Sequence, residues 1–105
     1  MSSPQIKYEE ASLVINKDDN FEYQHTIDYL GENGYIRVSN VRETGEFSVK
    51  GDVIDIFPSG YDNPVSVDTF GNEIEKLQIF NLKVQIPSDD INRLVVYTCI
   101  EFLCY

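Results

Sequence analysis

The spacing of apolar residues changes once along this chain, and that change restricts the folds that it can adopt. Tyr23, Ile27 and Leu30 recur at the spacing of one helix face. After Gly34, apolar residues instead alternate with polar ones in short runs. A period of two indicates strands buried on one face, and turn-forming residues between the runs indicate hairpins. The sequence therefore predicts a single α+β domain with one main helix and a largely antiparallel sheet of about six strands.

The predicted helix has sequence signals at both ends. Asp19 is the expected N-cap, because Glu22 follows it by three residues as in a capping box. Asn33 and Gly34 are expected to end the helix, since glycine readily adopts the left-handed conformation there. Gly31 lies inside the helix, where a glycine costs about 1 kcal/mol relative to alanine.

The strands are expected in short runs separated by turns. Ala11–Ile15 is expected to form an edge strand. Gly51 interrupts the alternating run 46–57 and is expected to mark a bulge, after which the strand presents a different face. Gly71-Asn72 is a two-residue hairpin signal. The remaining expected elements are strands at 36–41, 65–69, 73–80 and 91–100, a loop at 58–64 and a turn at 87–90.

Length and composition favour one domain taken from a longer polypeptide. The chain has 105 residues, which suits a single core. Residues 1–10 are expected to be a flexible leader, so that the domain spans 11–105, and the apolar ending 102–105 is typical of a segment within a larger protein. Cys99 and Cys104 are expected to be reduced thiols of a cytoplasmic protein. No apolar run approaches the ~20 residues needed to cross a membrane, and the isolated fragment is expected to be a monomer.

Charge and the scarcity of reactive side chains argue against several functions. The chain has 18 acidic and 8 basic side chains, a formal net charge of −10 and no run of Lys or Arg, which disfavours direct nucleic-acid binding. His25 is the only histidine and lies off the predicted helix face, so we expect a solvated residue and no metal site, cofactor or catalytic base. A GxxxxGK[ST] phosphate-binding loop is absent from the sequence.

A small hydrolase that uses paired carboxylates is the enzymatic alternative. Asp52 with Asp55, or Asp89 with Asp90, could supply an acid and a base. General acid–base catalysis needs two such groups in different environments within a cleft. Both pairs lie in or beside turn-forming residues, so solvated or turn-capping carboxylates are the preferred interpretation. No catalytic residue is predicted.

Strand alternation points to a binding surface instead. If Val65 and Val67 face the core, then Phe70 faces outward beside a hairpin turn. Exposed aromatic side chains among polar groups are typical of protein-binding sites, although Phe70 could equally cover a sheet edge or the loop at 58–64. Ser48 and Lys50 share a second outward face, on which Lys50 could also be an ordinary solvated lysine.

Two stretches resemble a known domain. Residues 45–58 (GEFSVKGDVIDIFP) and 63–80 (NPVSVDTFGNEIEKLQIF) are similar to segments shared by the bacterial transcription-repair coupling factor and the excinuclease protein UvrB. The resemblance extends over about residues 12–103 and favours the UvrA-interacting domain of the coupling factor, with the equivalent domain of UvrB as second choice.

This resemblance implies a non-catalytic domain that docks UvrA in nucleotide-excision repair. In the family, two basic side chains and one phenylalanine make the contact. Lys50 occupies the first basic position, Ser66 the second, and Phe70 matches the aromatic residue; Ser48 aligns with a further basic position of UvrB. Replacement of the usual arginines by Lys50 and Ser66 implies either a weaker contact or compensation by the nearby Arg37 or Arg42. The alternative is a structural domain that packs on, and is masked by, other domains of the parent translocase.

Overall fold

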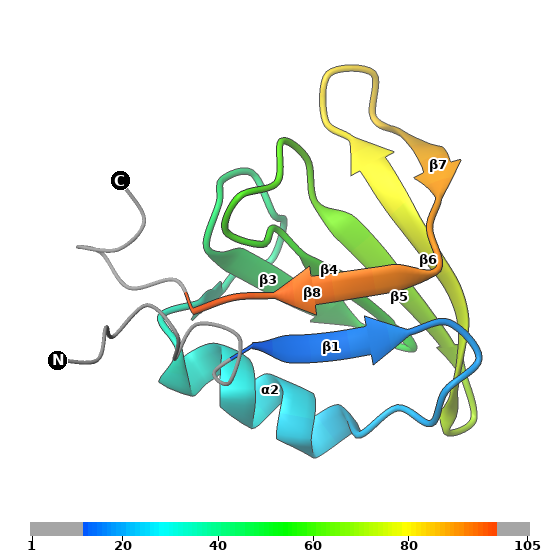
Figure 1. The fold of residues 1–105 in the computed structure, drawn as a ribbon. Coiled ribbons are helices and arrows are strands. Elements are labelled where there is room, and N and C mark those ends of the chain that lie inside the picture. The colour runs from blue at the N-terminus through cyan, green and yellow to red at the C-terminus, as the bar shows by residue number, and fades with distance from the viewer. Residues whose placement is uncertain (1–11, 99–105) are drawn as a thin grey trace, which may run out of the picture.

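The computed structural model describes residues 12–98, which form one helix and two β-sheets (Figure 1). The smaller sheet pairs β1 (Leu13–Asn16) with β8 (Arg93–Val96) in antiparallel fashion. The larger sheet has six strands in the order β2-β3-β4-β5-β6-β7. Their bounds are β2 Ile36–Arg37, β3 Glu46–Lys50, β4 Val53–Ile56, β5 Val65–Phe70, β6 Glu73–Asn81 and β7 Ile86–Asp90. All of the larger sheet's pairs are antiparallel except β2 with β3. The predicted α+β class is confirmed.

The expected leader and the two cysteines lie outside the described residues. Residues 1–11 and 99–105 are not described, so the predictions for the leader, for Cys99 and Cys104 and for the end of the last strand stay predictions. Within residues 12–98, no helix is long and apolar enough to cross a membrane.

The helix α2 (Tyr23–Glu32) begins later than the capping box predicted. Its N-cap is Glu22, which makes no side-chain capping hydrogen bond. The Asp19 prediction is wrong because the backbone there pairs with β6: the Ile74 amide donates to the Asp19 carbonyl at 3.0 Å. The helix does end at the expected place, with Asn33 as C-cap and Gly34 at a φ of 93°.

The buried side of α2 is rotated relative to the predicted one. Leu30 is fully buried and Ile27 is half-buried, but Thr26 is the other buried residue and Tyr23 is 45% exposed. His25 is exposed, as predicted.

Hairpins build most of the larger sheet. Gly51 does not mark a bulge: with a φ of 59° it forms, with Asp52, the two-residue turn that joins β3 to β4, so Lys50 pairs with Val53. The positive φ suits glycine because it lacks a Cβ atom. Gly71-Asn72 makes the predicted turn between β5 and β6. A bulge occurs in this hairpin instead, where Glu75 of β6 is the unpaired extra residue.

The predicted turn at 87–90 is a strand. Residues 86–90 form β7, which is exposed throughout and is the last strand of its sheet. A proline and acidic side chains are tolerated there because one side of an edge strand makes no backbone pairs, and they also discourage pairing with another chain. The predicted strand at 36–41 is shorter than expected, since only Ile36–Arg37 pairs with β3.

One face of the larger sheet carries the core. The strands β1 and β8 cross this face and α2 runs beside them, as Figure 1 shows. Side chains from the larger sheet, the small sheet and the helix form one cluster: Ile15, Leu30, Tyr35, Phe47, Ile54, Ile56, Val65, Val67, Ile74, Leu77, Leu94 and Val96. We call the opposite side of the six-stranded sheet the outer face. The small sheet and the helix cover the inner face and leave the outer face uncovered by either of them.

Candidate protein-docking surface

Strand register defines which side chains share the outer face. Residues paired directly across neighbouring strands point to the same side of a sheet. Val49, Ile54 and Val67 form one such row, on the core side. The neighbouring row, Lys50, Val53 and Asp68, therefore lies on the outer face.

Phe70 lies on this same face. It follows Asp68 by two positions in β5, and the bulge near this point adds its extra residue to β6, so alternation along β5 is unbroken. Its side chain is 76% exposed. The ring therefore projects from the end of β5, beside the Gly71 turn, and covers neither the sheet edge nor the 58–64 loop as a buried residue would.

Lys50 is exposed at the end of β3, and its Nζ donates a hydrogen bond to Asn40 Oδ1 at 2.6 Å. An ammonium group has three donors, so this bond leaves two for other acceptors. Asn40 lies in the irregular segment between β2 and β3. Strand alternation in the sequence did not predict that this segment contacts Lys50.

Ser66 is half-buried on the outer face, in the row that also contains Asp55. Its Oγ donates to Asp55 Oδ1 at 2.5 Å. The hydroxyl is thus satisfied within the domain, and the Asp55 carboxylate has a fixed orientation.

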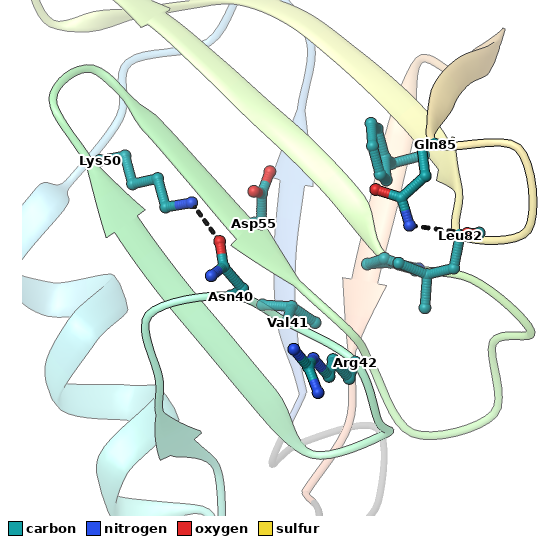
Figure 2. Close-up of a pocket in the computed structure, with 9 residues that line it drawn as sticks. Asn40, Val41, Arg42, Lys50, Asp55, Leu82 and Gln85 are labelled. Carbon is teal, nitrogen blue, oxygen red and sulfur yellow. Dashed lines mark hydrogen bonds between the residues drawn. The ribbon is translucent and has the colours of Figure 1, made fainter.

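Ser48 has the predicted parity but not the predicted accessibility. It is only 1% exposed, and among the described residues its Oγ has no hydrogen-bond partner. The segment containing Asn40 and the buried Val41 runs over β3 and β4 on this face (Figure 2). A side chain this buried offers a partner almost no surface. Strand alternation indicates the face of a residue, but not whether another segment covers it.

A pocket of about 440 Å³ lies on the outer face beside Lys50. Figure 2 shows Lys50 and Asp55 directed toward it from the sheet, with Arg42 on one side and Gln85 on the other. Its lining residues are Asn40, Val41, Arg42, Lys50, Asp55, Pro64, Phe80, Leu82 and Gln85. Two segments far apart in sequence, 40–42 and 82–85, therefore form its opposite walls.

The first wall is held by hydrogen bonds. Glu46 Oε1 accepts from the backbone amides of Arg42 and Glu43, at 2.8 and 3.0 Å. The Val38 amide donates to the Phe47 carbonyl at 2.8 Å, and Asn40 is tied to Lys50.

The second wall is held in a similar way. Asn81 Oδ1 accepts from the backbone amides of Lys83 and Val84, at 2.9 and 3.3 Å. The Gln85 backbone amide donates to the Asn81 backbone carbonyl at 2.7 Å, and Asn63 Oδ1 accepts from the Leu82 backbone amide at 3.2 Å. Both walls are therefore shaped before any partner arrives.

The sequence prediction missed this pocket. Arg42 and Asn40 belong to no sequence motif, and they line a pocket with Lys50 only because the chain folds back over β3. Among residues 12–98, no group of three or more His, Cys, Asp or Glu side chains could hold a metal ion. The outer face thus combines an exposed aromatic ring, a partly free ammonium and a preformed polar pocket, an arrangement suited to contact with another protein.

Comparison with known proteins identifies the family of the chain. Residues 13–102 match the family described as the UvrB interaction domain. The chain belongs to the UvrB interaction domain family. The resemblance carried by residues 45–58 and 63–80 is thereby confirmed.

Members of the UvrB interaction domain family occur in two kinds of relative. The chain is 35% identical over 103 residues to the transcription-repair-coupling factor of Mycobacterium bovis and 31% identical over 101 residues to that of Bacillus subtilis. Each match covers 96% of this chain and 8% of the relative. The UvrABC system protein B of Thermosipho africanus is 28% identical over 96 residues, which is 91% of this chain and 14% of that protein. The chain thus spans a small part of the relatives that it matches.

Proposed function

We propose that this chain is a non-catalytic docking domain that binds UvrA during transcription-coupled nucleotide-excision repair. It would act as part of a larger cytoplasmic coupling factor. Membership of the UvrB interaction domain family supports a role in protein contact. The 35% identity to the coupling factor of Mycobacterium bovis, against 28% for the UvrB protein, favours the coupling factor as the parent.

One observation carries the proposal: Phe70 is 76% exposed on the same face as Lys50. Keeping a phenylalanine ring in water is unfavourable, and burying it against a partner recovers that free energy. The Lys50 ammonium on the same face would add orientation and attraction toward an acidic partner surface. Lys50 and Phe70 would therefore act together, with Ser66 on the strand of Phe70 and its partner Asp55 on β4, the strand between β3 and β5. Ser48 would act from beneath, as part of the sheet, rather than by touching UvrA.

Titration of purified UvrA with this domain, followed by calorimetry, tests the proposal. We expect saturable binding, and we expect full-length UvrB to compete, because it carries a domain of the same family. An absence of binding at concentrations where UvrB binds UvrA would overturn the proposal. Binding that saturating UvrB leaves unchanged would also overturn it, since the two domains would then use different surfaces.

A further inference from the structure

The pocket beside Lys50 is basic on a molecule that is otherwise acidic. The chain has 18 acidic and 8 basic side chains. The pocket is lined by two cations, Lys50 and Arg42, and by one carboxylate, Asp55. The local charge balance is therefore the reverse of that of the whole chain, and an anionic group would be attracted here more than elsewhere.

The donors in the pocket are available. Lys50 uses one of its three donors on Asn40. The guanidinium of Arg42 is exposed and makes no hydrogen bond or ion pair with any residue in 12–98. The Arg42 backbone, by contrast, is held by Glu46. A planar guanidinium on an anchored backbone is well suited to a bidentate contact with a carboxylate.

Within residues 12–98, the acidic groups around these cations form no ion pair with them. Asp55 accepts a hydrogen bond from Ser66, and Glu46 accepts two from backbone amides, so both carboxylates are directed to other donors. Because hydrogen bonds also hold both walls, ordering the pocket would cost little free energy when a partner binds.

From these contacts we infer that the pocket receives a carboxylate side chain of the partner, held by the Arg42 guanidinium with Lys50 beside it. The inference rests on the proposed function and adds to it: Arg42 becomes a determinant of partner recognition, and the partner segment that enters the pocket is acidic. Lys50 lies in both the pocket and the face that carries Phe70, so one partner surface can cover both.

Substitution of Arg42 tests this inference, with Arg93 as the matched control. Arg93 is an exposed arginine of β8, in the small sheet on the opposite side of the core. Arg42→Gln and Arg93→Gln change the net charge equally, so a difference between them reports on position. We expect Arg42→Gln to raise the Kd for UvrA at least about tenfold, because it leaves a partner carboxylate unpaired. We expect Arg93→Gln to stay within about twofold of wild type, since a distant exposed charge is screened by salt.

Arg42→Lys separates charge from geometry. This variant keeps the charge but loses the bidentate fork, so its Kd should lie between those of wild type and Arg42→Gln. The dependence of the Kd on salt concentration should weaken in Arg42→Gln and remain in Arg93→Gln. Urea midpoints of all three variants should equal that of wild type, because both arginines are exposed.

The outcomes distinguish the inference from the proposed function. If wild type binds UvrA and the Kd of Arg42→Gln lies within twofold of the wild-type Kd, the partner does not use the pocket. The inference is then wrong, while the docking function stands. Equal weakening by Arg42→Gln and Arg93→Gln would show a general charge effect and would also overturn it. If wild type does not bind UvrA, both are rejected.

Discussion

Removal of the Phe70 ring should separate binding from folding. A phenylalanine side chain offers about 200 Å² for burial. Since 76% of Phe70 is exposed in the free domain, about 150 Å² remains for a partner to cover. At about 25 cal/mol per Å² this area corresponds to about 3.8 kcal/mol, an upper limit because alanine keeps the Cβ atom. Phe70→Ala should therefore cost about 2–3 kcal/mol of binding free energy, a rise of about 30- to 150-fold in Kd.

The folding of the same variant should hardly change. Little of the ring is buried in the free domain, so the free energy of unfolding should shift by no more than about 0.5 kcal/mol. Calorimetric titration with UvrA and urea denaturation, both on the same preparation, measure the two quantities. Val14→Ala, a truncation at a 39% exposed apolar residue of β1 in the small sheet, serves as the binding control. An unaltered Kd for Phe70→Ala would refute the assignment of this ring to the docking surface. A large loss of stability would refute its description as an exposed side chain.

Three further substitutions test the fold and its electrostatics. Ser48→Ala should raise the free energy of unfolding by about 1 kcal/mol, because the buried hydroxyl lacks a partner among the described residues, and a lower urea midpoint would contradict this. Gly31→Ala should raise it by about 0.5–1 kcal/mol, since nothing lies within 4 Å of an added Cβ in this helical position; a fall in thermal midpoint would show that the helix does not continue there. Burial raises the pKa of the Tyr29 phenol above 10.0, and its hydroxyl donates to the Val96 carbonyl at 3.0 Å. The contribution of the protonated Tyr29 phenol to the free energy of unfolding is therefore complete below pH 10.0 and is lost as the pH rises through the higher folded-state pKa. Tyr29→Phe should accordingly lose less stability than wild type between about pH 9 and pH 11. Parallel losses in the two proteins would disprove this linkage.

Features encoded by near neighbours were predictable from the sequence. The Gly71-Asn72 turn and the end of the helix at Asn33 follow from backbone conformations that glycine and asparagine favour. The outward position of Phe70 follows from alternation within a single strand, and the structure agrees. These signals need only a few consecutive residues, so they survive whatever the rest of the chain does.

Local signals misled where a distant segment competed for the same backbone. Asp19 has the chemistry of an N-cap, but its carbonyl pairs with β6, some fifty residues later in the chain. Residues 87–90 have turn-forming composition, but their place at the edge of the sheet allows a strand. In both cases tertiary pairing outweighs the local preference, which for an N-cap is worth about 1 kcal/mol.

The sequence by itself determined the α+β class, the Gly71-Asn72 hairpin and the face from which Lys50 and Phe70 project, because strand alternation and turn chemistry are short-range. Only the tertiary structure decided that Ser48 is covered and that Arg42 and Lys50 share a pocket. Those facts depend on the path of the chain over the outer face, where the segments 40–42 and 82–85 form opposite walls of one pocket. Burial and pocket shape are set by which distant segments approach each other, and no periodicity along one strand contains that information.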